Sequence, residues 1–199
     1  MQYAFLHVLR LVDMFLAYVE TEVVVSWLKQ IFSATFFVAV ANATTFLGSF
    51  YLSENYAASA ATIGTIYFIK ESLAIPAGYS GQYFIDSFGT KAVLVGSSLG
   101  LAVVAGATGV VDHFETYALL LIMNVCISKL FSTSSTNYAL SRVAPEQRTM
   151  CAAVQGAGLC LSGVALGASG FIMKAVGSTG FFLGTGAIGA VGGWLWLVL

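Results

Sequence analysis

The most constraining feature of the sequence is a series of six long apolar stretches separated by very short polar breaks. They cover approximately residues 27–52, 58–85, 91–111, 117–140, 150–173 and 180–199. A helix crosses the hydrocarbon core of a bilayer with about 20 apolar residues, and each stretch reaches that length. The stretches lack the alternation of apolar and polar residues that is typical of a barrel strand. The pattern therefore predicts an all-α polytopic membrane protein with six transmembrane helices.

The composition agrees with lipid as the main solvent. Only 9% of the 199 residues are charged and 58% are hydrophobic, whereas a soluble domain carries roughly 25% charged residues. The formal net charge of −1 provides no basic surface for nucleic acid. The sequence shows no nucleophile–base pair, phosphate-binding loop or metal-ligand spacing. We therefore expect an integral membrane protein that is not an enzyme and needs no cofactor, metal or nucleic acid.

Residues 1–26 are predicted to form an N-terminal helix that precedes a six-helix domain over 27–199. The helix is apolar but contains Arg10 and Asp13, which are three residues apart and can pair on one helical face. It lacks the charged start and the small-residue cleavage site of a signal peptide. We expect it to lie at the membrane interface or to pack against a partner, with a seventh span as the alternative.

The distribution of lysine and arginine predicts an orientation in the membrane. If Lys29 is cytoplasmic, six crossings place Lys91 and Arg148 on the same side. Glu54 and Glu115 then lie on the opposite side.

Three ionisable residues interrupt the apolar stretches near their centres, namely Lys70, Glu71 and Lys129. Placing a charged side chain near the centre of the bilayer costs at least about 2.5 kcal/mol of free energy. Such residues therefore usually face a cavity or a partner. One interpretation is a solute or proton pathway in which Glu71 loads and releases a proton. A second is an interhelical pair between Glu71 and Lys129. A third is contact with a neighbouring subunit.

Uncharged polar residues extend the candidate pathway. At about 100° per residue, five of them fall within roughly a third of the circumference of the fourth helix: Asn124, Ser128, Ser132, Ser135 and Thr136. Asn42, Thr45 and Ser49 share a face of the first helix. These residues either line a pathway or form interhelical hydrogen bonds, which are usually worth under about 1 kcal/mol each in lipid.

Glycines four residues apart predict close packing between helices, because they leave bare backbone on one face. The pairs are Gly96 and Gly100, Gly163 and Gly167, Gly180 and Gly184, and Gly189 and Gly193.

The loop after the second stretch resembles the signature loop of the major facilitator superfamily, Gly-x-x-x-Asp-[Arg/Lys]-x-Gly-[Arg/Lys]-[Arg/Lys]. Asp86, Gly89 and Lys91 stand at the mutual spacing of that motif. The sequence departs from the motif at Gln82, which replaces the first glycine, and at Ser87 and Thr90, which replace basic residues.

A second resemblance follows the fourth stretch, where residues 142–148 are similar to the Pro-Glu-x-Arg loop of facilitator halves. On the basis of these two loops, residues 29–199 resemble one six-helix half of a twelve-helix transporter, and they are closer to a C-terminal half. The resemblance implies a gating role for Asp86, Gly89, Lys91, Arg142, Glu146 and Arg148. It also implies a latch in which Asp86 pairs with Arg142 or Arg148.

By this resemblance we expect a half-size facilitator-type component that moves a small solute, with a proton, by alternating access. Such a half needs membrane lipid and another membrane subunit, in a homodimer or a hetero-complex. The alternative is a structural or accessory subunit of a large membrane protein complex that retains the fold without transport. The altered signature loop and the additional apolar helix favour that alternative.

Overall fold

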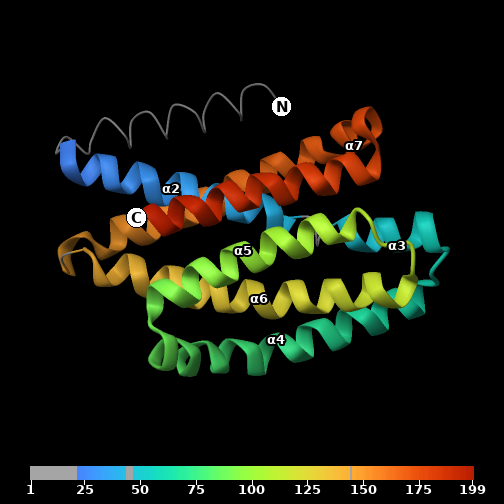
Figure 1. Cartoon of the computed structure of the whole chain (residues 1–199), viewed down its shortest axis with the longest axis horizontal. Coiled ribbons are helices and arrows are strands. Elements are labelled where there is room, and N and C mark those ends of the chain that lie inside the picture. Colours follow the sequence, from blue (N-terminus) through green and yellow to red (C-terminus); the bar gives the residue numbers. More distant parts are fainter. Residues whose placement is uncertain (1–21, 44–46, 144) are drawn as a thin grey trace.

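The computed structural model describes residues 22–43, 47–143 and 145–199, and this part of the chain is all-α (Figure 1). Its elements are α2 (Glu22–Ala43), α3 (Gly48–Tyr56), α4 (Ala60–Phe88), α5 (Thr90–Thr108), α6 (Phe114–Ser141), the short 3-10 helix η2 (Pro145–Gln147) and α7 (Arg148–Val198). α7 packs against α2 and α5, α5 packs against α6, and α6 packs against α4. The order of packing therefore places α4 at one edge of the bundle, as Figure 1 shows.

α7 consists of two helical segments that meet at Gly177. This residue has φ 77° and ψ 163°, a conformation that is essentially restricted to glycine. Figure 1 shows the chain reversing direction at this end of α7. The two segments correspond to the fifth and sixth apolar stretches of the sequence.

The described part of the first apolar stretch contains two helices, α2 up to Ala43 and α3 from Gly48. Thr45, predicted to share a polar face with Asn42, lies outside the described residues. So do residues 1–21, which hold most of the predicted N-terminal helix. α2 begins at Glu22 and continues through the boundary expected near residue 26.

Two apolar clusters form the core. In the larger, the Trp196 ring meets the rings of Phe131 and Tyr138 at centroid distances of 6.4 and 5.9 Å. In the smaller, the buried Tyr117 ring stacks on Tyr51 at 4.9 Å. The larger cluster joins α2, α5, α6 and α7, and the smaller joins α3, α4 and α6.

Tyr56 ties the end of α3 to the turn before α6. Its hydroxyl donates a hydrogen bond of 2.9 Å to the carbonyl oxygen of Val111. Burial raises the pKa of the Tyr56 phenol, and the nearby Tyr51 and Asp112 raise it further. The phenol therefore stays protonated, and remains a donor, over the physiological pH range.

A run of glycines lets the second segment of α7 approach its neighbours closely. We call Gly186, Gly189, Gly192 and Gly193 the glycine seam. A Cβ at Gly186 would lie 2.8 Å from the backbone nitrogen of Gly106 in α5, and a Cβ at Gly192 would lie 2.8 Å from Cγ2 of Val38 in α2. The seam thus brings three backbones together, as small residues do in membrane helices.

The predicted glycine pairs have different outcomes. Gly189, Gly193 and Gly100 do face other helices at close range, whereas the nearest atoms to Gly180 belong to Val176 of α7 itself. No atom lies within 4 Å of a Cβ built at Gly96, Gly163, Gly167 or Gly184. The described structure therefore assigns no packing role to those four, since the surfaces they leave bare have no described helix against them.

Large apolar side chains cover much of the outer surface. On α4 the exposed ones include Phe68, Ile75, Tyr79, Tyr83 and Phe88. Soluble monomers rarely expose apolar patches of this extent. Among the described residues, three helices are long and apolar enough to cross a membrane, at Thr90–Thr108, Phe114–Ser141 and Ser169–Val198. The structure thus shows an all-α chain with three candidate membrane-spanning helices, and six crossings stay a prediction.

Gly89 alone connects α4 to α5 and has φ 82° and ψ 147°. A side chain in this region of φ costs about 1–3 kcal/mol. We expect Gly89→Ala to lower the melting temperature of the purified protein in detergent. Gly96→Ala is the matched control, because Gly96 lies inside α5 with open space around it and alanine is the better helix former by about 1 kcal/mol. Equal melting temperatures for the two variants would contradict this account of the turn.

Candidate functional site

A lysine–glutamate pair interrupts the apolar surface of α4. Nζ of Lys70 lies 3.5 Å from Oε1 of Glu71, and their side chains are 11% and 64% exposed. The ammonium also lies 4.4 Å from the centroid of the Tyr67 ring, whose electron-rich face attracts a cation. The buried cation is therefore held by its neighbours, and the carboxylate stands at the surface of the bundle.

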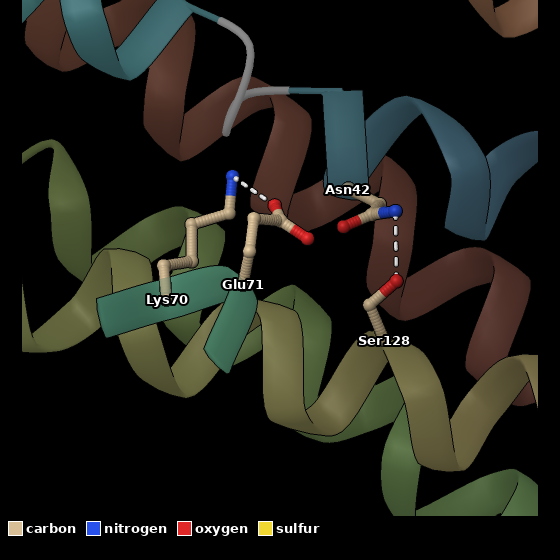
Figure 2. Close-up of polar contacts among 4 residues, drawn as sticks. All are labelled: Asn42, Lys70, Glu71 and Ser128. Atoms are coloured by element: carbon tan, nitrogen blue, oxygen red, sulfur yellow. Dashed lines mark hydrogen bonds and ion pairs between the residues drawn. The ribbon is translucent and has the colours of Figure 1, made fainter. Parts of the chain in front are cut away.

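A polar contact joins α2 to α6 in the same region. Nδ2 of Asn42 donates a hydrogen bond of 3.0 Å to Oγ of Ser128. Figure 2 shows these two side chains meeting between their helices, while Lys70 and Glu71 point toward the same region from α4. The structure therefore brings together four of the predicted pathway residues, which come from three helices.

α4 and α6 run in the same direction. Ile66 near the start of α4 packs in one cluster with Tyr117 and Leu121 near the start of α6. Further along, a Cβ at Gly81 would lie 3.3 Å from Thr133 of α6. This register places Lys129 of α6 about five residues beyond the level of Glu71, or roughly 8 Å along the helix axis at about 1.5 Å per residue.

The predicted interhelical pair between Glu71 and Lys129 is wrong for this structure. Among the described residues, Glu71 forms its ion pair with Lys70 of the same helix. Lys129 is exposed and forms no ion pair with a described acidic residue. A helix register that separates the two side chains explains the difference. The pathway and the neighbouring-subunit interpretations stay predictions.

The predicted polar stripe of α6 is divided between the interior and the surface. Asn124 is 2% exposed, and its Oδ1 has no hydrogen-bond partner among the described residues. Ser135 is also buried, and its carbonyl oxygen accepts a hydrogen bond of 3.2 Å from Nε2 of Gln155. These two residues belong to the packed interior and do not reach the exposed surface.

Ser132 and Thr136 are the exposed residues of the stripe, and the exposed Lys129 lies just beyond it. Lys129, Ser132 and Thr136 are spaced at i, i+3 and i+7, so they face the same way on the helix. Leu119 and Met123, which are also exposed on α6, are apolar. The helix thus presents one apolar surface, suited to lipid, and one polar surface. We call Asn42, Glu71, Ser128, Lys129, Ser132 and Thr136 the polar face.

The predicted latch of the signature loop is absent from the described structure. Asp86 forms no ion pair with Arg142 or Arg148 in this part of the chain. Its Oδ1 instead accepts a hydrogen bond of 2.8 Å from Nε2 of Gln82, and Oε1 of Gln82 accepts one of 3.3 Å from Nδ2 of Asn137. Two amide side chains, Asn137 of α6 and Gln82 of α4, therefore connect α6 to Asp86 in place of the predicted charge pair.

The other charged residues of the two loops have different surroundings. The Arg142 guanidinium lies 5.2 Å from the centroid of the Tyr138 ring. Arg148 begins α7 and Lys91 lies in the first turn of α5, both exposed. The side chain of Glu146 is outside the described residues.

Sequence reasoning missed the roles of Gln82 and Asn137. Gln82 was noted only as a departure from the family motif. Its spacing of four from Asp86 is a local signal for a helical pair. Its contact with Asn137 depends on the register of α4 against α6, for which the sequence carries no local signal.

The arrangement offers hydrogen-bond donors, an exposed carboxylate and an exposed ammonium. Among the described residues, no group of three His, Cys, Asp or Glu side chains is placed to hold a metal ion. The chemistry available on the polar face is therefore hydrogen bonding, together with electrostatic attraction at the exposed Glu71 and Lys129.

Comparison with known proteins adds no relative: no protein-family model matches the chain, and no curated protein matches it either. The likeness to the facilitator superfamily accordingly rests on the two loop motifs of the sequence.

Proposed function

We propose that this chain forms one half of a facilitator-type membrane transporter, which moves a small solute by alternating access once it is paired with a second half. The supporting observation is the charged pair on α4, whose Glu71 side chain is 64% exposed beside the Asn42–Ser128 contact. A charge directed into lipid costs at least about 2.5 kcal/mol, whereas one that faces a water-filled cavity avoids most of that cost. The polar face is thus one wall of a pathway, and the second half supplies the opposite wall.

The packing suits a wall that changes shape. α2 and α5 are fixed to α7 by the glycine seam, where a Cβ would clash with backbone. By contrast, α2 makes few contacts with α6, and the Asn42–Ser128 hydrogen bond joins them. An interhelical hydrogen bond in lipid averages about 0.6 kcal/mol. That hydrogen bond can therefore break and re-form in each transport cycle at low energetic cost while the seam stays intact.

The proposed half crosses the membrane six times, with the two segments of α7 as its last two crossings. Single cysteines at positions 91 and 115, in a variant without Cys126, Cys151 and Cys160, test this topology. We expect membrane-impermeant thiol reagents to reach the two positions from opposite sides, because the α5 span separates them. Both positions are exposed in the fold. Accessibility from the same side would contradict the number of crossings.

The absent latch favours the second candidate function, a structural or accessory subunit of a large membrane complex. A transporter of the resembled family needs its loops to hold one gate shut, and here Asp86 is engaged by Gln82. Under this alternative, the exposed apolar side chains of α4 contact partner subunits.

Purification in mild detergent followed by reconstitution separates the two candidates. For a transporter half we expect a small paired unit that supports saturable solute exchange, driven by a pH gradient, in protein-containing vesicles. Protein-free vesicles provide the baseline. Recovery only as part of a large hetero-complex, together with no exchange above that baseline, would refute transport and support the structural subunit.

A further inference from the structure

Three charges lie on or beside the polar face, those of Lys70, Glu71 and Lys129, and they do not balance. Lys70 and Glu71 lie 3.5 Å apart and neutralise each other. Lys129 is exposed within α6 and has no acidic partner among the described residues. One uncompensated positive charge therefore remains on a surface that belongs to a candidate membrane-spanning helix.

The surroundings of Lys129 identify the kind of group that would meet it. An ammonium has three donors and no acceptor, and a serine or threonine hydroxyl can also donate. Ser132 and Thr136 present two exposed hydroxyls on the same side of α6. Donors gathered around a positive charge best match an oxygen acceptor that carries a negative charge, because such hydrogen bonds are roughly twice as strong as neutral ones.

We infer that the polar face binds an anionic solute, a carboxylate or phosphate-type oxyanion, through Lys129 with help from the hydroxyls of Ser132 and Thr136. The inference rests on the proposed function, since it names the substrate class of that pathway. Lys70 is not the binding group, because its side chain is 11% exposed and already engaged by Glu71. The exposed ammonium of Lys129 attracts the anion out of water and fixes it on α6.

The charge selectivity of the face can be measured without knowing the solute. Ser132→Cys in the full chain, without the three native cysteines, places one thiol a single turn from Lys129. The probes are two methanethiosulfonate reagents of similar size, the anionic sulfonatoethyl and the cationic trimethylammonioethyl compound. Each rate is divided by the rate of the same reagent with free cysteine. Taking the ratio of the two corrected rates removes any change in the reactivity of the thiol itself.

We expect the anionic reagent to react at least about tenfold faster on this corrected scale, which corresponds to about 1.4 kcal/mol. Adding Lys129→Gln should bring the ratio close to one. Lys91→Gln is the matched control, because Lys91 is an exposed lysine outside the polar face and its loss should leave the ratio unchanged. If Ser132→Cys does not fold, Thr136→Cys presents a thiol on the same stripe.

The possible failures are distinguishable. Three results would overturn the anion inference without contradicting the proposed pathway. They are equal corrected rates, a faster reaction of the cationic reagent, and a ratio that does not change with Lys129→Gln. Failure of both reagents to reach either thiol from either side of the membrane would show that the face is dry, and would overturn the proposed function as well.

Discussion

Replacing Glu71 with glutamine is expected to abolish pH-driven solute uptake in reconstituted vesicles while the protein still inserts and pairs. Glutamine keeps the shape and much of the hydrogen bonding of glutamate but cannot take up or release a proton. The Glu71 side chain is 64% exposed, so under the proposed function it opens onto the water of the pathway. We expect uptake to fall at least about a hundredfold, the lower end of the effect of losing a positioned proton-transfer group.

The same substitution should also have a measurable effect on stability, because it leaves Lys70 without its carboxylate. Removal of one partner costs about 3–5 kcal/mol in a fully buried pair and about 0–1 kcal/mol in an exposed pair. The Lys70–Glu71 pair is intermediate, since one member is buried and the other is exposed. The aromatic ring of Tyr67, 4.4 Å from the ammonium, retains part of the support for the cation. We therefore expect a loss of about 1–2 kcal/mol, below the cost of a fully buried pair.

A double variant separates the two effects. Lys70→Met together with Glu71→Gln removes the unpaired cation and fills its place with an apolar chain of similar length. It should restore the melting temperature without restoring uptake. Recovery of uptake along with stability would show that Glu71 acts only through Lys70. The structural-subunit alternative predicts a different result. The Glu71→Gln variant would fail to assemble, the double variant would assemble, and the original protein would show no uptake.

Gly186→Ala is expected to be the most destabilising single-methyl change in the glycine seam. A Cβ at this position would lie 2.8 Å from the backbone nitrogen of Gly106 and 2.9 Å from the carbonyl oxygen of Ala102. Both atoms belong to the backbone of α5 and cannot move aside as a flexible side chain can. Overpacking usually costs about 1–3 kcal/mol, and we expect the upper end of that range. At roughly 2–4 °C per kcal/mol for a chain of this size, the melting temperature in detergent should fall by several degrees.

Gly184→Ala is the control for this prediction, because it lies two residues away in the same helical segment. No atom lies within 4 Å of a Cβ built at Gly184, and alanine favours the helix by about 1 kcal/mol over glycine. The control should therefore be neutral or slightly stabilising. A large loss from Gly184→Ala with little effect from Gly186→Ala would mean that the close approach lies on the other face of α7.

The apolar runs of the sequence were sufficient to predict that the chain is helical and where most of its helices lie, although the first run contains two helices, α2 and α3. A helix satisfies its backbone hydrogen bonds within one segment, so long apolar runs identify helices without knowledge of their neighbours. The turn at Gly89 was also visible locally, because a glycine between two apolar runs is the residue that tolerates a positive φ. The position of Lys70 and Glu71 within α4 followed directly from the apolar run that surrounds them.

Which of these residues contact one another depends on the packing of the helices and could not be read from the sequence. The partner of Glu71 is Lys70 rather than Lys129, and the Asn42–Ser128 contact spans 86 residues of sequence. Such choices depend on the rotation of each helix about its axis and on the register of α4 against α6. A shift of a few residues in that register would change every pairing without altering any helix.

The glycines illustrate the same division. A spacing of four identified Gly189 and Gly193 but also Gly184, which faces open space, and it passed over Gly186 and Gly192 at the points of closest approach. Spacing along one helix shows which residues share a face. It does not show whether another backbone lies opposite, because that depends on how the whole bundle packs.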